Sequence, residues 1–244
     1  MNTIEIKNLH FSYNAGEEIL KGLNLTIDER STAIIGQNGA GKTTFVKLLK
    51  GLLCPTEGQI LFNGQDISKQ TVATLAKDIG LIFQNPNDQI FKNTVLDEVM
   101  FGPMQIGMSK DKAKEVALKA LDMVGLKGTE KINPYDLGLS ERKMVSIAAI
   151  VAMDTKVVIF DEPTIAQDYM GKKRIQAIMK ELQRQHKIVI SILHDMDFVA
   201  ETFDRAIVFA KGDALLDGDV KSVFKEKDIL EKAYLEQPYT MQLR

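Results

Sequence analysis

The chain has 244 residues, 45% of them hydrophobic and 26% charged, which is the composition of an ordinary globular protein with a sizeable core. Its 31 Lys and Arg residues nearly balance 33 Asp and Glu residues, which excludes the basic excess expected of a nucleic-acid-binding protein. The single cysteine, Cys54, excludes an internal disulfide framework and a cysteine-rich metal cluster, and it fits a reducing compartment.

The first third of the chain is predicted to consist mainly of strands. Residues 4–11 and 23–27 alternate apolar and polar side chains. Residues 31–36, 58–64 and 79–84 are short apolar runs bounded by turn residues. The alternating start lacks the apolar core of a signal peptide, and no apolar run approaches the roughly 18 residues that a membrane span requires. We therefore expect another chain to hold this protein at any membrane on which it acts.

The middle of the chain is predicted to be helical and its last third mixed. From about residue 95 to 153, apolar residues recur at spacings of three and four, which indicates helices. Strands return at residues 156–163, 186–194 and 204–210, and residues 222–236 are predicted to form an amphipathic surface helix. This order favours one α/β domain with a helical insertion.

The strongest chemical pattern is "GQNGAGKT", residues 36–43, which matches a phosphate-binding loop between a predicted strand and a predicted helix. Its glycines allow backbone N–H groups to turn inward around phosphates, and the helix N-terminus adds partial positive charge. Lys42 is expected to reach the β- and γ-phosphates and the Thr43 hydroxyl to bind Mg²⁺. A plain glycine-rich turn is the alternative, but the full match in this context favours a nucleotide site. The residues expected to bind nucleotide here are Gly36, Asn38, Gly39, Ala40, Gly41, Lys42, Thr43 and Thr44.

A site for nucleotide and magnesium requires a carboxylate at the end of a neighbouring strand, and "KVVIFDEP" supplies two of them. Asp161 is placed to hold Mg²⁺, and Glu162 to polarise the water that attacks the γ-phosphate. An acidic turn that caps a helix beginning at Pro163 is the alternative. The phosphate loop earlier in the chain makes the catalytic interpretation the better one.

Two further polar residues follow predicted strands. Gln84 closes one strand and His194 another, and ligands of open α/β sheets lie at the carboxyl ends of strands. A lone His or Gln usually carries no function, but their shared position favours a role for both. Gln84 is predicted to bind magnesium or the attacking water, and His194 to hydrogen-bond the γ-phosphate.

The order of phosphate loop, strand-end glutamine, helical segment, "FDEP" and "LHDM" resembles the ATP-binding subunit of an ABC transporter over nearly the whole chain. The resemblance implies ATP and Mg²⁺ as cofactors, with Lys42, Gln84, Glu162 and His194 as catalytic residues. It also implies a single domain, residues 1–244, with a P-loop NTPase core, an antiparallel β subdomain and a helical subdomain inserted at about residues 86–153.

Further segments extend the resemblance. "FSY" is similar to the segment of the family that stacks on adenine, which places Tyr13 on the base. "IAQD", residues 165–168, stands at the place of the D-loop, with Asp168 as its aspartate. Residues 83–103 resemble the energy-coupling factor type, importers of vitamins and transition-metal ions. Within them, Phe91 and its apolar neighbours are predicted to form either the core of the helical segment or a groove for a membrane subunit.

"LGLSE", residues 137–141, stands where the family has its signature L-S-G-G-Q. In this alignment Gly138 replaces the serine, Leu139 and Ser140 replace the two glycines, and Glu141 replaces the glutamine. An alternative alignment that starts at Leu139 restores the serine. It also shortens the link to the following helix by two residues, which would turn the helix face by about 200°. We therefore prefer the first alignment.

The resemblance implies that this segment touches the γ-phosphate of ATP bound to the opposite subunit. Gly138 has no hydroxyl, Leu139 would crowd the backbone approach that glycine permits, and Glu141 would bring negative charge toward a polyphosphate. We predict a degenerate signature. The alternative is a working variant in which Ser140 and the helix N-terminus still donate hydrogen bonds.

We therefore predict an ATP-hydrolysing motor subunit of an importer, peripheral on the cytoplasmic face of the cell membrane. Its expected partners are a second, different ABC ATPase, a transmembrane coupling subunit and a substrate-binding membrane subunit, with no nucleic acid. A mainly non-hydrolytic assembly subunit is one alternative. A soluble ATPase acting on nucleic acid or ribosomes is another, disfavoured by the near-neutral charge and the absence of a long coiled-coil insertion between Thr43 and Asp161.

Overall fold

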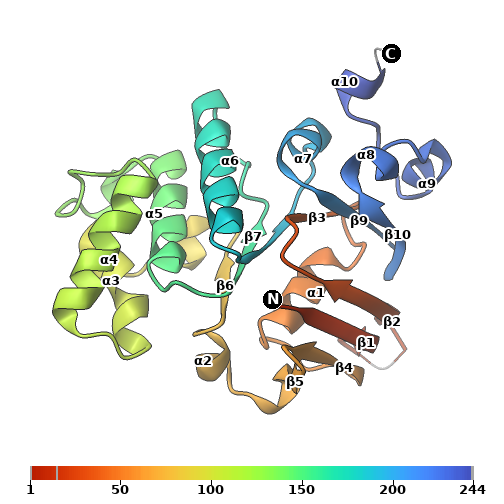
Figure 1. Cartoon of the computed structure of the whole chain (residues 1–244), viewed down its shortest axis with the longest axis horizontal. Coiled ribbons are helices and arrows are strands. Elements are labelled where there is room, and N and C mark those ends of the chain that lie inside the picture. Colours follow the sequence, from red (N-terminus) through yellow and green to blue (C-terminus); the bar gives the residue numbers. More distant parts are fainter. Residues whose placement is uncertain (1, 15, 243–244) are drawn as a thin grey trace.

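The computed structural model describes residues 2–14 and 16–242, which form two sheets with helices around them (Figure 1). The first sheet has the order β2-β1-β4-β5 and contains β1 (Ile4–Ser12), β2 (Glu18–Ile27), β4 (Glu57–Phe62) and β5 (Gln65–Asp66). The second has the order β10-β9-β3-β8-β7-β6 and contains β3 (Thr32–Ile35), β6 (Ile79–Ile82), β7 (Val157–Asp161), β8 (Ile188–Ile192), β9 (Arg205–Ala210) and β10 (Asp213–Asp219).

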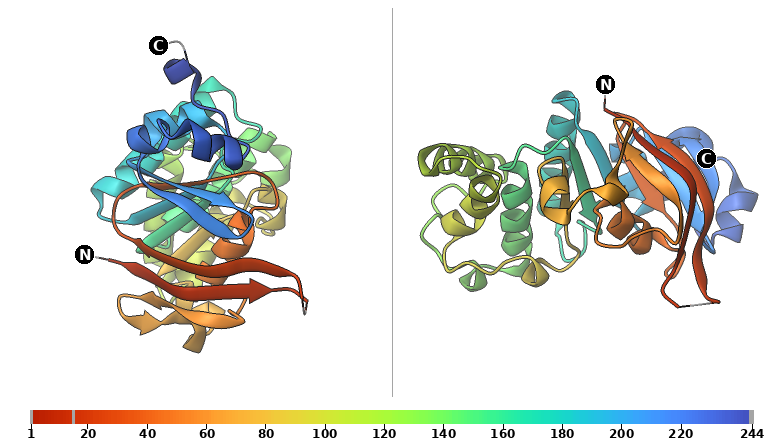
Figure 2. Two further views of the ribbon diagram at one scale, coloured as in Figure 1. Left: turned by 90° about the vertical axis from the view of Figure 1, so that its right-hand side faces the viewer. Right: turned by 90° about the horizontal axis from the view of Figure 1, so that it is seen from below.

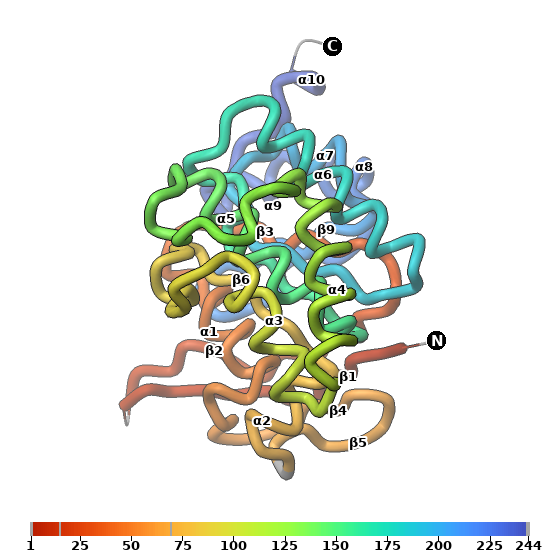
Figure 3. The backbone as a smooth tube through the Cα atoms, turned by 90° about the vertical axis from the view of Figure 1, so that its left-hand side faces the viewer, coloured from red at the N-terminus to blue at the C-terminus, as the bar shows by residue number. Residues whose placement is uncertain are grey.

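The helices of the middle of the chain form a group of their own (Figure 2). The longer helices of the middle of the chain, α3 to α5, lie together at the end of the molecule away from the antiparallel sheet (Figures 2 and 3). The α-helices are α1 (Lys42–Leu49), α2 (Val72–Leu75), α3 (Val95–Gln105), α4 (Lys110–Met123), α5 (Leu139–Val151), α6 (Tyr169–Arg184), α7 (Met196–Thr202), α8 (Val220–Val223), α9 (Lys227–Lys232) and α10 (Tyr239–Gln242). Short 3-10 helices are η1 (Ile67–Lys69), η2 (Pro86–Asp88) and η3 (Pro134–Asp136). Within the described residues, no helix is long and apolar enough to cross a membrane.

Side chains of the central strand β3 alternate between two cores. Ala33 and Ile35 belong to the core shared with the helices, whereas Ile34 belongs to the core shared with the antiparallel sheet. Every residue of β3 is buried, including Thr32, which explains why its three apolar residues follow one another instead of alternating with polar ones. In the second core, Phe45 of α1 packs against Phe209 of β9 with 5.3 Å between ring centroids. The helix that follows the phosphate loop is thereby anchored in the interior.

Parallel pairing decides where the polar strand ends lie. β3 pairs with β8 and β9, and β7 pairs with β6 and β8, all in parallel. The carboxyl ends of β3, β6, β7 and β8 therefore meet at one edge of the sheet, where the loops that follow them begin. β10 pairs antiparallel with β9 at the outer edge.

The predicted fold class is confirmed, since an α/β core with a parallel sheet carries a separate antiparallel sheet and a group of helices. The prediction of one helix over residues 222–236 is wrong. The chain forms α8 and α9 instead, because Phe224 is fully buried and Glu226 adopts a non-helical backbone conformation, with φ −81° and ψ 67°. β10 lies where no strand is predicted, because its three aspartates are typical of turns.

A buried arginine joins the two sheets. Arg205 on β9 is only 4% exposed, and its guanidinium donates from Nε and Nη2 to the carboxylate of Asp217 on β10. Its Nη1 donates to the carbonyl oxygen of Thr26 on β2 at 2.7 Å. One side chain therefore connects three strands and fixes the antiparallel sheet relative to the strand beside β3.

We expect Arg205→Ala to lower the free energy of unfolding by about 3 kcal/mol, because it leaves a partly buried carboxylate and a backbone carbonyl without their partner. The matched control is Arg184→Ala, which removes an exposed ion pair with Glu181 and should change stability by about 0.5 kcal/mol or less. Denaturant unfolding followed by circular dichroism measures both. Equal losses of unfolding free energy in the two variants would show that the buried contacts of Arg205 stabilise the fold no more than an exposed ion pair does.

Candidate functional site

The phosphate loop has a backbone that only glycine permits at its start. Gly36 follows β3 directly with φ +154°, and a Cβ at this position would lie 2.2 Å from the carbonyl oxygen of Phe209. Gly39 and Gly41 have φ values of +80° and +98°, and Gly41 is the N-cap of α1. The predicted loop therefore turns sharply between strand and helix, with α1 beginning at Lys42. This is the geometry in which backbone N–H groups bind phosphate.

A cavity of about 200 Å³ lies at the phosphate loop. It is lined by Ile19, Asn38, Gly39, Ala40, Gly41, Lys42, Thr43, Thr44 and Glu162. Lys42 is 5% exposed, and its ammonium donates to the carbonyl oxygens of Gly36 at 2.6 Å and Gln37 at 2.9 Å. Burial lowers the pKa of Lys42, while the carboxylates of Glu162 and Asp161 oppose that shift. The structure thus places the lysine between the loop and the predicted carboxylate pair.

Asp161 is the last residue of β7 and is 9% exposed. Its Oδ1 is buried and has no hydrogen-bond partner within the part of the chain that is described. Burial raises the pKa of Asp161, Glu162 raises it further, and the lysines nearby act in the opposite direction. A buried, unpaired carboxylate oxygen is an exception that calls for an explanation, and it suits a cation that takes oxygen ligands. With the exposed hydroxyl of Thr43, Asp161 supplies a donor set that fits Mg²⁺.

The carboxylate of Glu162 contacts the side chains of the two other polar residues that follow strands, His194 and Gln84. His194 Nε2 lies 3.0 Å from Glu162 Oε1, and Gln84 Nε2 donates to Glu162 Oε2 at 3.4 Å. Glu162 itself has a left-handed backbone with φ +45°, and its N–H donates to the carbonyl oxygen of Ile192 at 3.1 Å. Such a conformation costs about 1–3 kcal/mol for a residue with a side chain, and it is typical of functional sites. The structure therefore brings together the three residues predicted from three different strands.

Tyr13 lies beside the phosphate loop. Its ring is 54% exposed and packs edge-on against Phe11 with 4.8 Å between centroids. Its hydroxyl lies 3.4 Å from Oγ1 of Thr44. An exposed ring at this place can stack on a flat group that extends away from the phosphates.

The signature segment begins α5. Gly138 is the N-cap of this helix, and its N–H donates to Oε2 of Glu141 at 3.0 Å. Leu139 is 43% exposed, and the hydroxyl of Ser140 donates to Oε1 of Gln167 at 2.7 Å. The polar side chains of this segment are therefore engaged inside their own chain.

The predicted D-loop aspartate, Asp168, also forms its hydrogen bond within the chain. Asp168 is the N-cap of α6 and accepts from the N–H of Gly171 at 2.7 Å. Gln167 beside it carries no prediction from the sequence, yet it accepts the hydrogen bond of Ser140.

A second residue without a prediction from the sequence is Lys143, which is 2% exposed. Its position on the apolar side of "LSERKMVSIAAIV" was the available signal, because lysine is almost never fully buried without partners.

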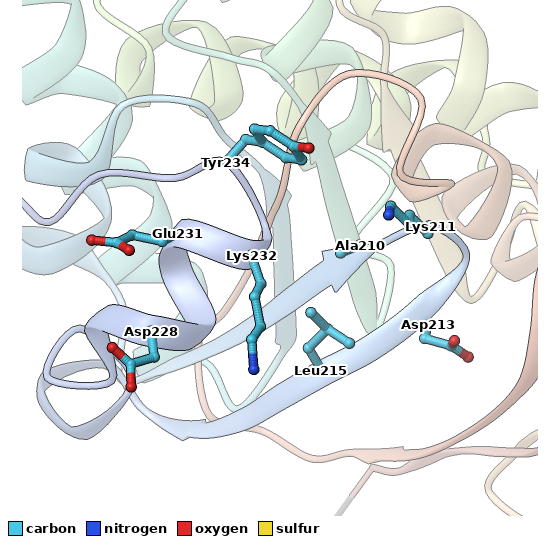
Figure 4. Close-up of a pocket in the computed structure, with 8 residues that line it drawn as sticks. All are labelled: Ala210, Lys211, Asp213, Leu215, Asp228, Glu231, Lys232 and Tyr234. Atoms are coloured by element: carbon cyan, nitrogen blue, oxygen red, sulfur yellow. The ribbon is translucent and has the colours of Figure 1, made fainter.

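A larger cavity lies elsewhere, between the β9–β10 hairpin and α9 (Figure 4). It measures about 790 Å³ and is lined by Ala210, Lys211, Asp213, Leu215, Asp228, Glu231, Lys232 and Tyr234. These residues include charges of both signs, and none of them lines the cavity at the phosphate loop. We assign the functional site to the smaller cavity, because catalytic groups converge there and size alone carries no chemistry.

Replacing Asp161 with asparagine is expected to abolish the effect of Mg²⁺ on nucleotide binding and to slow hydrolysis about 100-fold or more, because a metal's charge stabilisation is worth several kcal/mol. When both proteins are kept metal-free with EDTA, the free energy of unfolding of Asp161→Asn at pH 7 should be higher than that of the wild type. The raised pKa of Asp161 means that folding disfavours its charged form, a cost present at neutral pH and lost as the pH falls.

Fluorescence titration with a labelled ATP, in Mg²⁺ and in EDTA, measures the binding part of this prediction. Asp213→Asn, which changes an exposed carboxylate outside the loop cavity, is the control. Unchanged magnesium dependence in Asp161→Asn would remove this residue from the metal site.

Comparisons with known proteins identify the family of the chain. The profile of the ABC transporter family matches residues 20–165. The chain is 36% identical to the energy-coupling factor transporter ATP-binding protein EcfA of Methanocaldococcus jannaschii, over 98% of this chain and 86% of that protein.

Among solved structures, cbiO1 from Clostridium perfringens, part of the ABC transporter complex cbiONQ, has a TM-score of 0.84 and 33% identity, with 94% and 93% of the two chains covered. The dimeric cassette MJ0796, in a post-hydrolysis state bound to ADP and Pi, has a TM-score of 0.80 and 27% identity, with 89% and 98% covered.

Proposed function

The chain belongs to the ABC transporter family of ATP-binding proteins, which hydrolyse ATP to drive transport, and we propose that it is a motor subunit of an energy-coupling factor importer. The similarity to EcfA and cbiO1 over nearly the whole chain supports this type. The cargo of such an importer is a vitamin or a transition-metal ion, which its membrane subunits bind. This chain would lie on the cytoplasmic face of the membrane, held there by a transmembrane coupling subunit and a substrate-binding membrane subunit.

The observation that carries the hydrolytic role is the position of Glu162 between His194 and Gln84. In the proposed mechanism the phosphate loop and Lys42 hold the phosphates, and Tyr13 stacks on adenine. Asp161, Thr43 and Gln84 hold Mg²⁺, which neutralises charge on the phosphates when bound. Glu162 would orient the attacking water and take its proton as the bond between the γ-phosphorus and the bridging oxygen of ADP breaks. His194, whose Nε2 lies 3.0 Å from Glu162 in this structure, would donate its Nε2–H to the γ-phosphate when nucleotide is bound.

Glu162→Gln is expected to lower kcat about 100-fold or more, because the amide cannot accept the proton, while nucleotide affinity changes little. Phosphate release and labelled-ATP binding measure the two quantities. Glu181→Gln, on the outer face of α6, is the matched control and should retain activity. If the complex that contains Glu162→Gln still hydrolyses ATP at the original rate, either the partner ATPase carries out the hydrolysis and this chain is the non-hydrolytic assembly subunit, or this chain uses another base.

We further propose that the signature of this chain is degenerate and that its partner is a different ABC ATPase. The hydroxyl of Ser140 donates to Gln167, and the carboxylate of Glu141 accepts from the N–H of Gly138. Neither side chain is therefore free to contact a nucleotide on the partner. In a heterodimer, this chain's phosphate loop and the partner's signature would make one hydrolytic site. The other site, completed by "LGLSE", would mainly hold nucleotide.

Residues 86–153 are proposed as the helical subdomain that contacts the coupling subunit. Of the apolar residues at its start, Ile90 and Val95 are buried in the core, which leaves them unavailable to a partner. Phe91 is 57% exposed and packs edge-on against Phe101 with 4.8 Å between centroids. An exposed aromatic ring that packs on a half-buried one suits a docking surface for a short helix of a membrane subunit.

Restoring L-S-G-G-Q at residues 137–141 tests the heterodimer. We expect the purified wild-type chain to hydrolyse ATP at least about tenfold more slowly than the full complex, and the restored chain to gain activity alone. Because the restoration also removes the partner of Gln167, a Gln167→Ala variant with the original signature is the control for that loss. A wild-type chain that works alone at the rate of the complex, unaffected by the restoration, would mean that "LGLSE" is a functional variant.

A further inference from the structure

Lys143 presents the least expected burial in the molecule. It lies one turn into α5, is 2% exposed, and makes no ion pair within 4.0 Å in the residues described. Its ammonium instead donates to two backbone carbonyl oxygens, that of Phe83 at 2.8 Å and that of Gln84. A buried charge without a bonded counter-ion is costly, so these two acceptors must hold it closely.

From this contact we infer that Lys143 is a positioning residue, which holds the backbone of Gln84 so that its side chain reaches Glu162. The inference rests on the proposed hydrolytic function. Gln84 has an exposed side chain, and its contact with Glu162 is long, at 3.4 Å, so that contact alone defines its position weakly. The hydrogen bond from Lys143 to the carbonyl oxygen of Gln84 fixes the backbone of Gln84, and so it limits the positions that the Gln84 side chain can take.

Neighbouring residues of α5 strengthen the same attachment. Arg142 Nη1 donates to Oδ1 of Asn87 at 2.8 Å, and Gln89 Nε2 donates to the carbonyl oxygen of Ser146 at 3.1 Å. These contacts hold the segment 83–89 further along, whereas Lys143 acts at Gln84 itself. The segment is therefore fixed to one helix at both of its ends.

The pKa of Lys143 reflects both its burial and the charges nearby. Burial lowers the pKa of Lys143 to about 8, while Asp161 and Glu162 act against this shift. The ammonium in turn opposes the rise in the pKa of Asp161.

The consequence is that α5 serves two nucleotide sites. Its first turn carries the signature residues, which face the partner's nucleotide in the proposed dimer, and its second turn carries Lys143, which acts on the chain's own site. A movement of α5 relative to the parallel sheet would therefore displace Gln84 from Glu162. This connects events at the two sites through one rigid helix.

A double-mutant cycle in the complex with the partner ATPase tests this inference. Lys143→Met keeps the apolar stem and removes the donors, and we expect kcat to fall about tenfold with KM within about twofold. The cycle is completed by Gln84→Ala. If Lys143 acts through Gln84, then Lys143→Met should change kcat by less than about twofold in the Gln84→Ala background. Effects that multiply in the double variant would overturn the inference.

Hydrogen exchange of the nucleotide-free chain gives a readout that does not depend on hydrolysis. Amides of residues 83–89 should exchange about tenfold faster in Lys143→Met, while those of α1 stay unchanged. Lys119→Met, at a 72% exposed side chain on α4, is the control. Unchanged exchange at residues 83–89 contradicts the inference.

Two further results keep the test interpretable. If Lys143→Met fails to fold, Lys143→Gln provides a shorter side chain with one donor group for the same cycle, and Lys143→Arg should recover part of kcat in either case. If Glu162→Gln retains full activity, the proposed function fails. If Glu162→Gln is inactive but the Lys143 and Gln84 effects multiply, only the present inference fails.

Discussion

The parallel pairing of β6, β7, β8 and β3 is the constraint on which the functional site depends. Backbone hydrogen bonds place the carboxyl ends of these strands at one edge, although their residues are far apart in the sequence. Gly36, Gln84 and His194 follow three of these strands, Asp161 ends the fourth, and they meet there for that reason. The side chains contribute the chemistry, but the ladder of the sheet decides that they act together.

At this edge, backbone strain and burial give Glu162 and Asp161 properties that these residue types do not have on an exposed surface. Glu162 has a left-handed backbone, and Asp161 keeps a buried oxygen without a partner in the described structure. Both features oppose folding, and both suit a site that receives a cation and a polyphosphate. Lys42 and Lys143 approach the two carboxylates from different elements and balance part of their charge.

Helix α5 shows how a departure from the family pattern can be absorbed locally. Glu141 caps the helix through Gly138, and Ser140 binds Gln167 near the start of α6. These contacts satisfy the polar groups of the segment within one chain, and so the fold tolerates the altered signature. In the proposed heterodimer the partner would supply an intact signature to the site built on this chain's phosphate loop and Glu162.

The sequence by itself determined the phosphate loop, the acidic strand end, the α/β fold class and the family, because these depend on local spacing and residue type. Only the tertiary structure decided the engagement of Ser140 by Gln167, the break between α8 and α9, and the burial of Lys143 against Gln84. Each depends on contacts between segments distant in the chain or on the packing of one residue, such as Phe224, which no local pattern encodes.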